Sequence, residues 1–354
     1  MKENLKNLLG YARYYLGIQK IPDILNNINI ETTSRCNLKC KFCAYDKRNL
    51  DEVPYTTMPQ EMFEDVVKQS LDLGYENIGL TPTTGDIFMD KKLFDKLIFL
   101  DNQSRLDGYY FYTNFIPLNQ NIIDQIFNLK KIKNFGISIY GNDLETFKKL
   151  SGGNEIAYNK LLENLRYFKN KILTSSPKFK VEISQRTLKQ FKLSEAYDEI
   201  SKIIKELLSK NLIEFSQNSE FNNWGGLIKE KDIDGLGIKL HDPNKKKIGS
   251  CSLIYSRLII GANGLVNACA CRDANYTLAI GSVKNNKLKE IINLKNVKYR
   301  ELIERQERND FPDVCKSCDF YKSIYQSNDF IWSFRNKKIK HNSLKNVFRT
   351  LENR

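Results

Sequence analysis

Histidine is scarce in this sequence, with two residues in 354. They are His241 and His341, and neither has a second histidine at the spacing of a zinc-ligand pair. Long apolar runs are also missing: none approaches the roughly 20 residues that cross a bilayer, and the N-terminus has no apolar core followed by a cleavage site of small residues. The sequence therefore predicts neither an imidazole-rich metal site nor a membrane span, and we expect a cytoplasmic protein.

Acidic residues are too few to balance the basic ones, and the formal net charge is +14. A charge of this sign suits nucleic acid, an anionic membrane or a phosphorylated substrate. The lysines are scattered along the whole chain, however, which is typical of solvated surfaces, and no basic stretch is interleaved with aromatic residues for base stacking. Nucleic acid is therefore not the expected partner, and the densest basic run, residues 335–345, is expected to be a surface helix or tail.

The eight cysteines are spaced too unevenly for a secreted disulfide scaffold, and in a large intracellular chain such clusters indicate metal. One group lies near the N-terminus and the other follows residue 250: Cys36, Cys40 and Cys43, then Cys251, Cys269, Cys271, Cys315 and Cys318. Ligation that is rich in thiolate and poor in imidazole suits iron-sulfur clusters or a cysteine-only zinc site.

Short apolar strands alternate with longer helical periods through the first two thirds of the chain. The predicted strands are residues 28–32, 77–80, 109–112, 134–140, 179–186 and 212–216. The predicted helices between them are residues 59–73, 91–103, 119–128, 143–168 and 192–210. Such units give parallel strands with right-handed crossovers. Eight units need roughly 250 residues and about 190 are present, so we expect an α/β fold with a partial (β/α)6 TIM-like barrel whose site lies at the C-terminal ends of the strands.

The remaining segments complete the expected domain organisation. Asn263-Gly264 between two apolar stretches predicts a β-hairpin, and the polar stretch before it reads as a linker. The expected units are an N-terminal amphipathic helix (1–25), the partial barrel (26–228), a linker (229–249), a small cysteine-rich domain (250–322) and a basic tail (323–354).

The first cysteine group directly follows the first predicted strand, where Cys36, Cys40 and Cys43 are separated by three and then two residues. Three such thiolates can hold three irons of a cubane and leave the fourth iron open. This segment, with the aromatic Phe42 before the third cysteine, resembles the signature of the radical S-adenosylmethionine (SAM) superfamily. The resemblance implies that SAM binds the open iron of a 4Fe-4S cluster and is cleaved to a 5′-deoxyadenosyl radical. A structural zinc site is the alternative, but no fourth protein ligand is nearby.

The same resemblance suggests further SAM-binding residues at the strand ends. Gly85 and Asp86 stand where the family usually has Gly-Gly-Glu, and Thr113-Asn114 matches a Thr-Asn pattern after the third strand. Ser138 stands where family members bind the ribose, and Arg186 where a basic residue can pair with the SAM carboxylate. Each of these also has an ordinary structural reading.

The second cysteine group resembles the Twitch form of the SPASM auxiliary-cluster domain. Cys251 and Cys269 enclose seventeen residues with the hairpin glycine between them, and Cys315-Lys316-Ser317-Cys318 follows. By that resemblance Cys251, Cys269, Cys315 and Cys318 bind one auxiliary 4Fe-4S cluster, and Cys271 is left as a free thiol. A zinc ribbon remains the alternative.

The resemblance implies an oxidoreductase that removes hydrogen from a sugar-like or other small biosynthetic metabolite, with the auxiliary cluster as electron acceptor and flavodoxin or ferredoxin as electron donor. Maturation of a peptide or protein side chain is an alternative. A second alternative is an RNA- or membrane-associated binding protein that uses the basic tail and the N-terminal helix. The loop at residues 222–226 is expected at the barrel rim, where Trp224 covers the edge or walls the substrate pocket.

Overall fold

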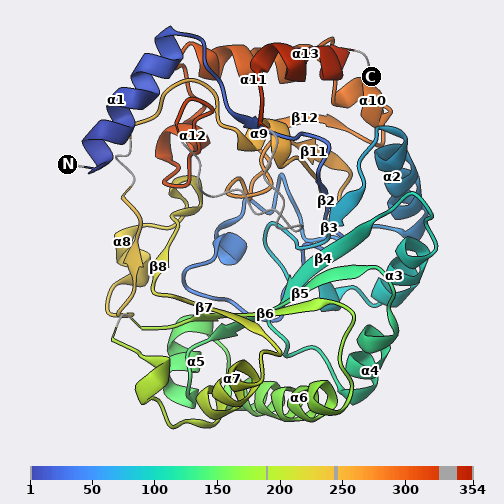
Figure 1. Ribbon diagram of the computed structural model, residues 1–354, viewed down its shortest axis with the longest axis vertical. Helices are drawn as coiled ribbons and strands as arrows, with labels where there is room; N and C mark the ends of the chain where they lie inside the picture. Colours follow the sequence, from blue (N-terminus) through green and yellow to red (C-terminus); the bar gives the residue numbers. More distant parts are fainter. Residues whose placement is uncertain (1, 189, 243–245, 327–340, 353–354) are drawn as a thin grey trace.

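The computed structural model describes residues 2–188, 190–242, 246–326 and 341–352, and a nine-stranded sheet forms its centre (Figure 1). Six strands are parallel and follow one another along the sheet in chain order: β2 (Ile28–Ile30), β3 (Asn77–Gly79), β4 (Gly108–Thr113), β5 (Ile132–Tyr140), β6 (Lys180–Arg186) and β7 (Glu214–Asn218). The predicted partial barrel of six parallel strands is confirmed.

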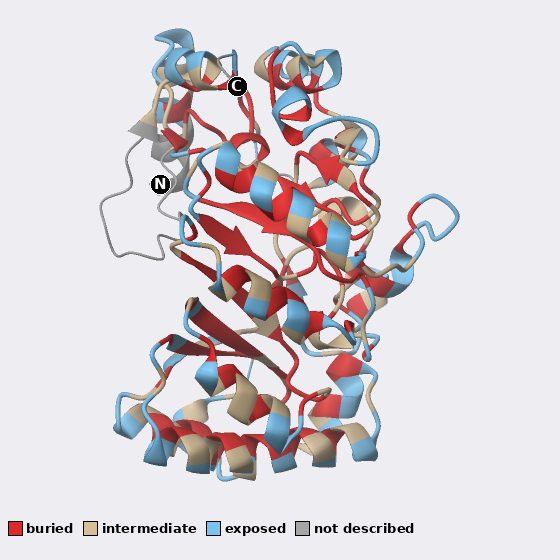
Figure 2. Ribbon diagram, turned by 90° about the vertical axis from the view of Figure 1, so that its right-hand side faces the viewer, coloured by how far each residue is buried: buried red, intermediate tan, exposed pale blue. Residues whose placement is uncertain are grey.

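Helices cover the outer face of these strands, with their exposed sides turned outward (Figure 2). They are α2 (Gln60–Asp72), α3 (Leu93–Asp101), α4 (Gln120–Asn128), α5 (Leu144–Ser151), α6 (Glu155–Thr174) and α7 (Glu199–Ser209). Apolar residues of the strands face them: Phe135 of β5 packs edge-on against Phe168 of α6, with ring centroids 6.1 Å apart. The residues at alternate positions of the same strands face the barrel interior.

The helix predicted over residues 143–168 is wrong in one respect, because two helices fill that range. Gly152 takes a left-handed conformation (φ +67°) that ends α5. Two residues later, the Asn154 side chain accepts a hydrogen bond from the Ala157 amide and begins α6. The last predicted helix is also shorter than expected, since a single 3-10 turn at Leu193–Glu195 precedes α7.

The cysteine-rich C-terminal region continues the barrel sheet. The predicted hairpin is present as β10 (Ile259–Ile260) and β11 (Leu265–Asn267), with Gly264 at φ +87° in its turn, and β12 (Ala279–Ser282) adds a further strand. Because β10 pairs in parallel with β2, the expected division near residue 250 is not a break in the sheet. Four helices complete this region: α9 (Leu253–Ser256), α10 (Leu288–Ile291), α11 (Val297–Glu307) and α12 (Asp313–Ser317).

A buried carboxylate ties this region to the barrel. Glu31, at the end of β2, accepts hydrogen bonds from the amide of Thr83, the amide of Ala262 and the hydroxyl of Tyr276. Its pKa is raised because it is buried, while the nearby Arg48 guanidinium opposes that shift. One side chain therefore connects β2, the loop after β3 and the hairpin turn.

The linker and the N-terminal segment both contain a strand that was not predicted. The expected linker contains α8 (Glu230–Ile233) and β9 (Lys239–Leu240), which pairs with β8 (Glu220–Phe221). The helix expected at the start is α1 (Lys2–Tyr15), and β1 (Ile21–Pro22) pairs with β13 (His341–Asn342) from the other end of the chain.

In the predicted basic tail (323–354), residues 327–340 lie outside the described residues, and with them residues 335–340 of the densest basic run. The part that follows forms β13 and α13 (Leu344–Glu352), whose Val347 and Leu351 are buried, so it packs on the fold. Within the described ranges no helix is both long enough and apolar enough to cross a membrane.

Candidate active site and auxiliary cysteine site

The N-terminal cysteine triplet forms a loop at the C-terminal end of β2, held by backbone hydrogen bonds. The amides of Lys39 and Lys41 donate to carbonyls at the end of α5, at 3.2 and 3.1 Å. The amide of Cys43 donates to the carbonyl of Cys40 at 3.0 Å, and the hydroxyl of Tyr45 accepts from the amide of Cys36 at 3.0 Å. The loop therefore has a fixed course without help from the cysteine side chains.

Burial raises the pKa of all three thiols. Burial raises the pKa of Cys36 to about 12. The pKa of Cys40 rises well above its usual range through burial and then through the charges of Cys43 and Cys36, while Arg186 opposes the shift. Iron binding displaces these protons, so the triplet is a set of three neighbouring sulfurs that a cluster would convert to thiolates.

In the part of the chain that the structure describes, no three His, Cys, Asp or Glu side chains converge closely enough to hold one metal ion. A structural zinc ion needs four ligands at about 2.0–2.3 Å, whereas a cubane holds one cysteine at each of several irons. The zinc alternative thus has no converged ligand set at either group.

The carboxylate of Asp86 forms its hydrogen bonds with other residues of the protein. Its carboxylate accepts from the amide of Phe88 (3.0 Å), the hydroxyl of Thr113 (2.9 Å) and the amide of Asn114 (2.6 Å). Burial raises its pKa to about 6, which these three donors partly oppose. Its neighbour Gly85 takes φ +141°, and a Cβ there would lie 2.9 Å from the carbonyl oxygen of residue 35 in the cysteine loop. Direct contact of these two residues with SAM stays a prediction.

Asn114 lies beside the triplet. Its amide nitrogen donates to the side-chain oxygen of Asn37 at 2.7 Å and lies 4.0 Å from the sulfur of Cys36. The amide oxygen of Asn114 accepts from the amide of Ile116, which fixes the orientation of the side chain. The structure therefore brings this predicted residue to the cluster loop.

Phe42 and Arg186 are also brought together at this rim. The guanidinium of Arg186 lies 5.7 Å from the ring centre of Phe42 and 5.6 Å from that of Phe221. Burial raises the pKa of Cys40 and Cys43, and the charge of Arg186 opposes that rise. Ser138 is half-buried on the inner face of β5, in register with Ser184 of β6. Their roles toward SAM remain predictions.

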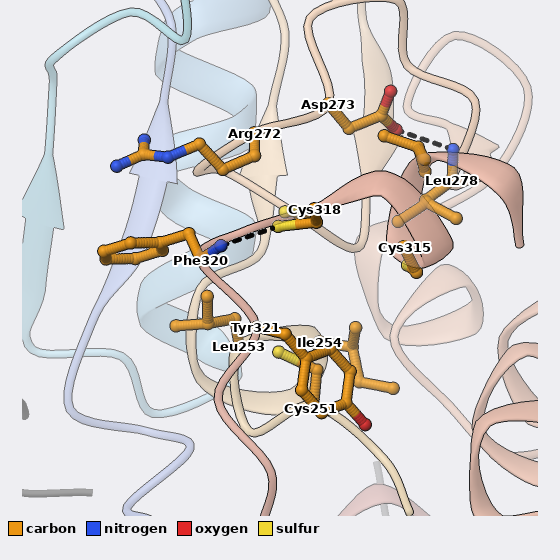
Figure 3. Close-up of a pocket in the computed structure, with 12 residues that line it drawn as sticks. Cys251, Leu253, Ile254, Arg272, Asp273, Leu278, Cys315, Cys318, Phe320 and Tyr321 are labelled. Atoms are coloured by element: carbon orange, nitrogen blue, oxygen red, sulfur yellow. Dashed lines mark hydrogen bonds between the residues drawn. The ribbon is translucent and has the colours of Figure 1, made fainter. Parts of the chain in front are cut away.

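Four cysteines of the second group line one cavity (Figure 3). Its lining includes four cysteines: Cys251, Cys269, Cys315 and Cys318. Cys271 is not among the lining residues. These are the four sulfurs that the sequence predicts as ligands of an auxiliary cluster.

Three of these sulfurs accept hydrogen bonds from nitrogen. The amide of Lys322 donates to Cys251 at 3.4 Å, that of Phe320 to Cys318 at 3.3 Å, and the side chain of Gln306 to Cys315 at 3.3 Å. Donors of this kind stabilise ligating thiolates and tune cluster potentials. The cavity therefore suits a cluster held by four cysteines.

Sequence reasoning missed the polar network inside the barrel. The hydroxyl of Tyr112 donates to Glu182 at 2.6 Å. Nearby, the hydroxyl of Tyr110 donates to Asn29 at 3.1 Å and accepts from Arg257 at 2.9 Å. Polar residues at every second position of β4, β5 and β6 were the available signal, because parallel strands buried on both faces are usually apolar throughout.

Comparison with known proteins gives a match for each of the two regions that carry a cysteine group. The family model described as the radical SAM superfamily matches residues 30–176, and that of the SPASM iron-sulfur cluster-binding domain matches residues 251–319. Two curated relatives are GTP 3′,8-cyclases. That of Aquifex aeolicus is 22% identical over 320 residues, covering 82% of this chain and 96% of the relative. That of Clostridium perfringens is 23% identical over 262 residues, covering 71% and 76%.

Among solved structures, BtrN in complex with AdoMet and 2-DOIA aligns with a TM-score of 0.51 at 15% identity, covering 84% of this chain and 94% of that one. This likeness shows a shared fold. The two family models imply a 4Fe-4S cluster with SAM at the barrel and an auxiliary iron-sulfur cluster behind it. The chain thus belongs to the radical SAM superfamily and carries a C-terminal SPASM-type iron-sulfur cluster-binding domain.

Proposed function

We propose that this radical SAM enzyme oxidises a sugar-like or similar polar small metabolite and passes one electron to its auxiliary cluster. The observation that carries the proposal is the cavity with four cysteine sulfurs. A cluster with a cysteine on each iron has no open iron for a substrate. Such a cluster is suited to moving electrons, which an oxidation requires.

Oxidation of a carbinol carbon to a carbonyl removes one hydrogen atom, one proton and one electron. When bound, the N-terminal cluster and SAM supply a 5′-deoxyadenosyl radical that takes the hydrogen atom, and the auxiliary cluster supplies an acceptor for the electron. The protein's own residues bind and orient the reactants. Asn114 and Arg186 flank the cysteine loop, and Asp86 holds the amide of Asn114 in place.

The polar side chains on the inner face of the barrel favour a polar substrate. The carboxylate of Glu182 and the hydroxyls of Tyr110 and Tyr112 form its network. Gly79 and Gly136 leave room for the two tyrosines, since a Cβ at Gly136 would lie 2.1 Å from the ring of Tyr112 and one at Gly79 2.5 Å from the hydroxyl of Tyr110. An interior with so many hydroxyl and carboxylate groups favours a ligand that forms several hydrogen bonds.

A second candidate comes from the curated relatives, which are named as GTP 3′,8-cyclases. In that case the substrate would be a nucleoside triphosphate, and its hydrogen abstraction would lead to ring closure without net oxidation by the auxiliary cluster. The identity to these relatives is 22% and 23%, so their named activity is the second candidate and not the first.

Anaerobic reconstitution with iron, sulfide, SAM and dithionite distinguishes the two. We expect 5′-deoxyadenosine to form faster with polyols or cyclitols than without them, and deuterium at the carbinol carbon to appear in the 5′-deoxyadenosine. A carbonyl product should accompany it. Formation of a cyclised nucleotide from GTP, with no response to any polyol, would contradict the oxidation and support the second candidate.

A further inference from the structure

The rim loop around Trp224 contacts both cysteine sites. The indole nitrogen of Trp224 donates to the backbone carbonyl of Phe42, the residue before Cys43, at 2.9 Å. The next residue, Gly225, lies against α12, where a Cβ would approach the side chain of Val314 to 2.5 Å. The loop therefore lies between the N-terminal triplet and the helix that carries Cys315.

The side chain of Arg272 completes this connection. Its guanidinium lies 5.4 Å from the ring centre of Trp224 and 4.2 Å from that of Phe320, and Figure 3 shows it extended beside Phe320. The amide of Phe320 donates to the sulfur of Cys318 at 3.3 Å. The guanidinium also donates a hydrogen bond to the backbone carbonyl of Cys271, and within the described residues its buried Nε has no hydrogen-bond partner. The two ring contacts are cation–π contacts.

Arg272 lies between the two sites. It lines the cavity of the second cysteine group, and its contact with Trp224 places it next to the ring that is hydrogen-bonded to the backbone of Phe42, the neighbour of Cys43. Two other cations each lie at one set: Arg186 stacks on Phe42, the residue before Cys43, and Lys247 donates to the backbone carbonyl of Lys316, the residue after Cys315. Replacing Arg186 or Lys247 therefore provides a control that should affect one cluster only.

We propose that Arg272 is a positioning residue that joins the two cluster sites through Trp224 and Phe320 and makes the cluster at each site easier to reduce. The inference rests on the cysteine assignment proposed above. A fixed positive charge favours the form of a cluster that holds one more electron, and local charge is one of the factors that set cluster potentials. Arginine suits this place because it keeps its charge when desolvated and stacks on aromatic rings.

The test is an anaerobic redox titration with dithionite, followed by electron paramagnetic resonance. A Cys36→Ala/Cys40→Ala/Cys43→Ala background isolates the auxiliary cluster, and a Cys251→Ala/Cys269→Ala background isolates the N-terminal one. In both backgrounds Arg272→Gln should lower the reduction equilibrium constant about tenfold, a shift of about 59 mV to more negative potential for one electron. Arg272→Lys should stay near the parent value.

The controls should each act on one cluster. Lys247→Gln should shift the auxiliary cluster alone, and Arg186→Gln the N-terminal cluster alone. Unchanged potentials in Arg272→Gln with full iron content, or a shift in one background only, would overturn the inference. If Arg272→Gln does not load iron, the inference is tested with Arg272→Lys. A tenfold change of the reduction equilibrium constant in that variant would overturn the inference, because lysine keeps the positive charge. Loss of all iron in either cysteine background would instead contradict the cysteine assignment.

Discussion

Cys269 and Cys271 are two residues apart, yet they have different surroundings, and replacing each with alanine should give different iron contents. Cys269 lines the cavity with Cys251, Cys315 and Cys318, and Cys271 does not line it. A chain that holds two 4Fe-4S clusters contains about eight irons. We expect Cys269→Ala to retain about four, all at the N-terminal triplet, and Cys271→Ala to retain about eight.

The assay is the ratio of iron to protein after anaerobic reconstitution, together with 5′-deoxyadenosine formation. Both variants should still cleave SAM, because the N-terminal triplet is unchanged. The double variant tests whether Cys271 can replace its neighbour: it should hold the same four irons as Cys269→Ala. Loss of four irons from Cys271→Ala and none from Cys269→Ala would refute the ligand assignment.

Four further predictions concern the two sites and the barrel. The variant with alanine in place of Cys36, Cys40 and Cys43 should stay folded, keep about four irons and form no 5′-deoxyadenosine; cleavage of SAM at the normal rate would contradict the SAM site. Metal analysis of the wild-type protein should find about eight irons, and tightly bound zinc with only four would disprove the auxiliary cluster. The raised pKa of Asp86, about 6, means that the folded state holds its proton more tightly, so stability should fall by up to about 3 kcal/mol as pH rises from about 4 through 6. Urea unfolding across this range should show a smaller fall for Asp86→Asn, and an equal fall would exclude Asp86 as its source. Tyr112→Phe leaves the buried carboxylate of Glu182 without its closest donor, and should raise KM for a polyol substrate about tenfold, for a cost of about 1–2 kcal/mol, with iron content unchanged; an unchanged KM would remove Tyr112 from the substrate site.

The sequence was a good guide where one local pattern decides the structure. The six strands were found because apolar stretches separated by helical periods leave few alternatives to a parallel sheet. The break between α5 and α6 was missed because apolar periodicity continues on both sides of it, although Gly152 and Gly153 marked the place. The polar stretch at residues 229–249 was read as a linker, yet its Leu240 is buried where β9 pairs with β8.

By itself, the sequence determined the chemistry: the spacing of Cys36, Cys40 and Cys43 directly after a strand specifies three neighbouring thiols on one loop. Only the tertiary structure decided what lies between the two cysteine groups. Arg272 is more than two hundred residues from Cys43, and no periodic pattern marks a side chain whose partners are two rings from separate loops. The polar barrel interior and the pairing of β10 with β2 are of the same kind. Spacing along the chain fixes contacts only over a few residues, whereas these contacts form when the sheet curves and brings distant strand ends to one rim.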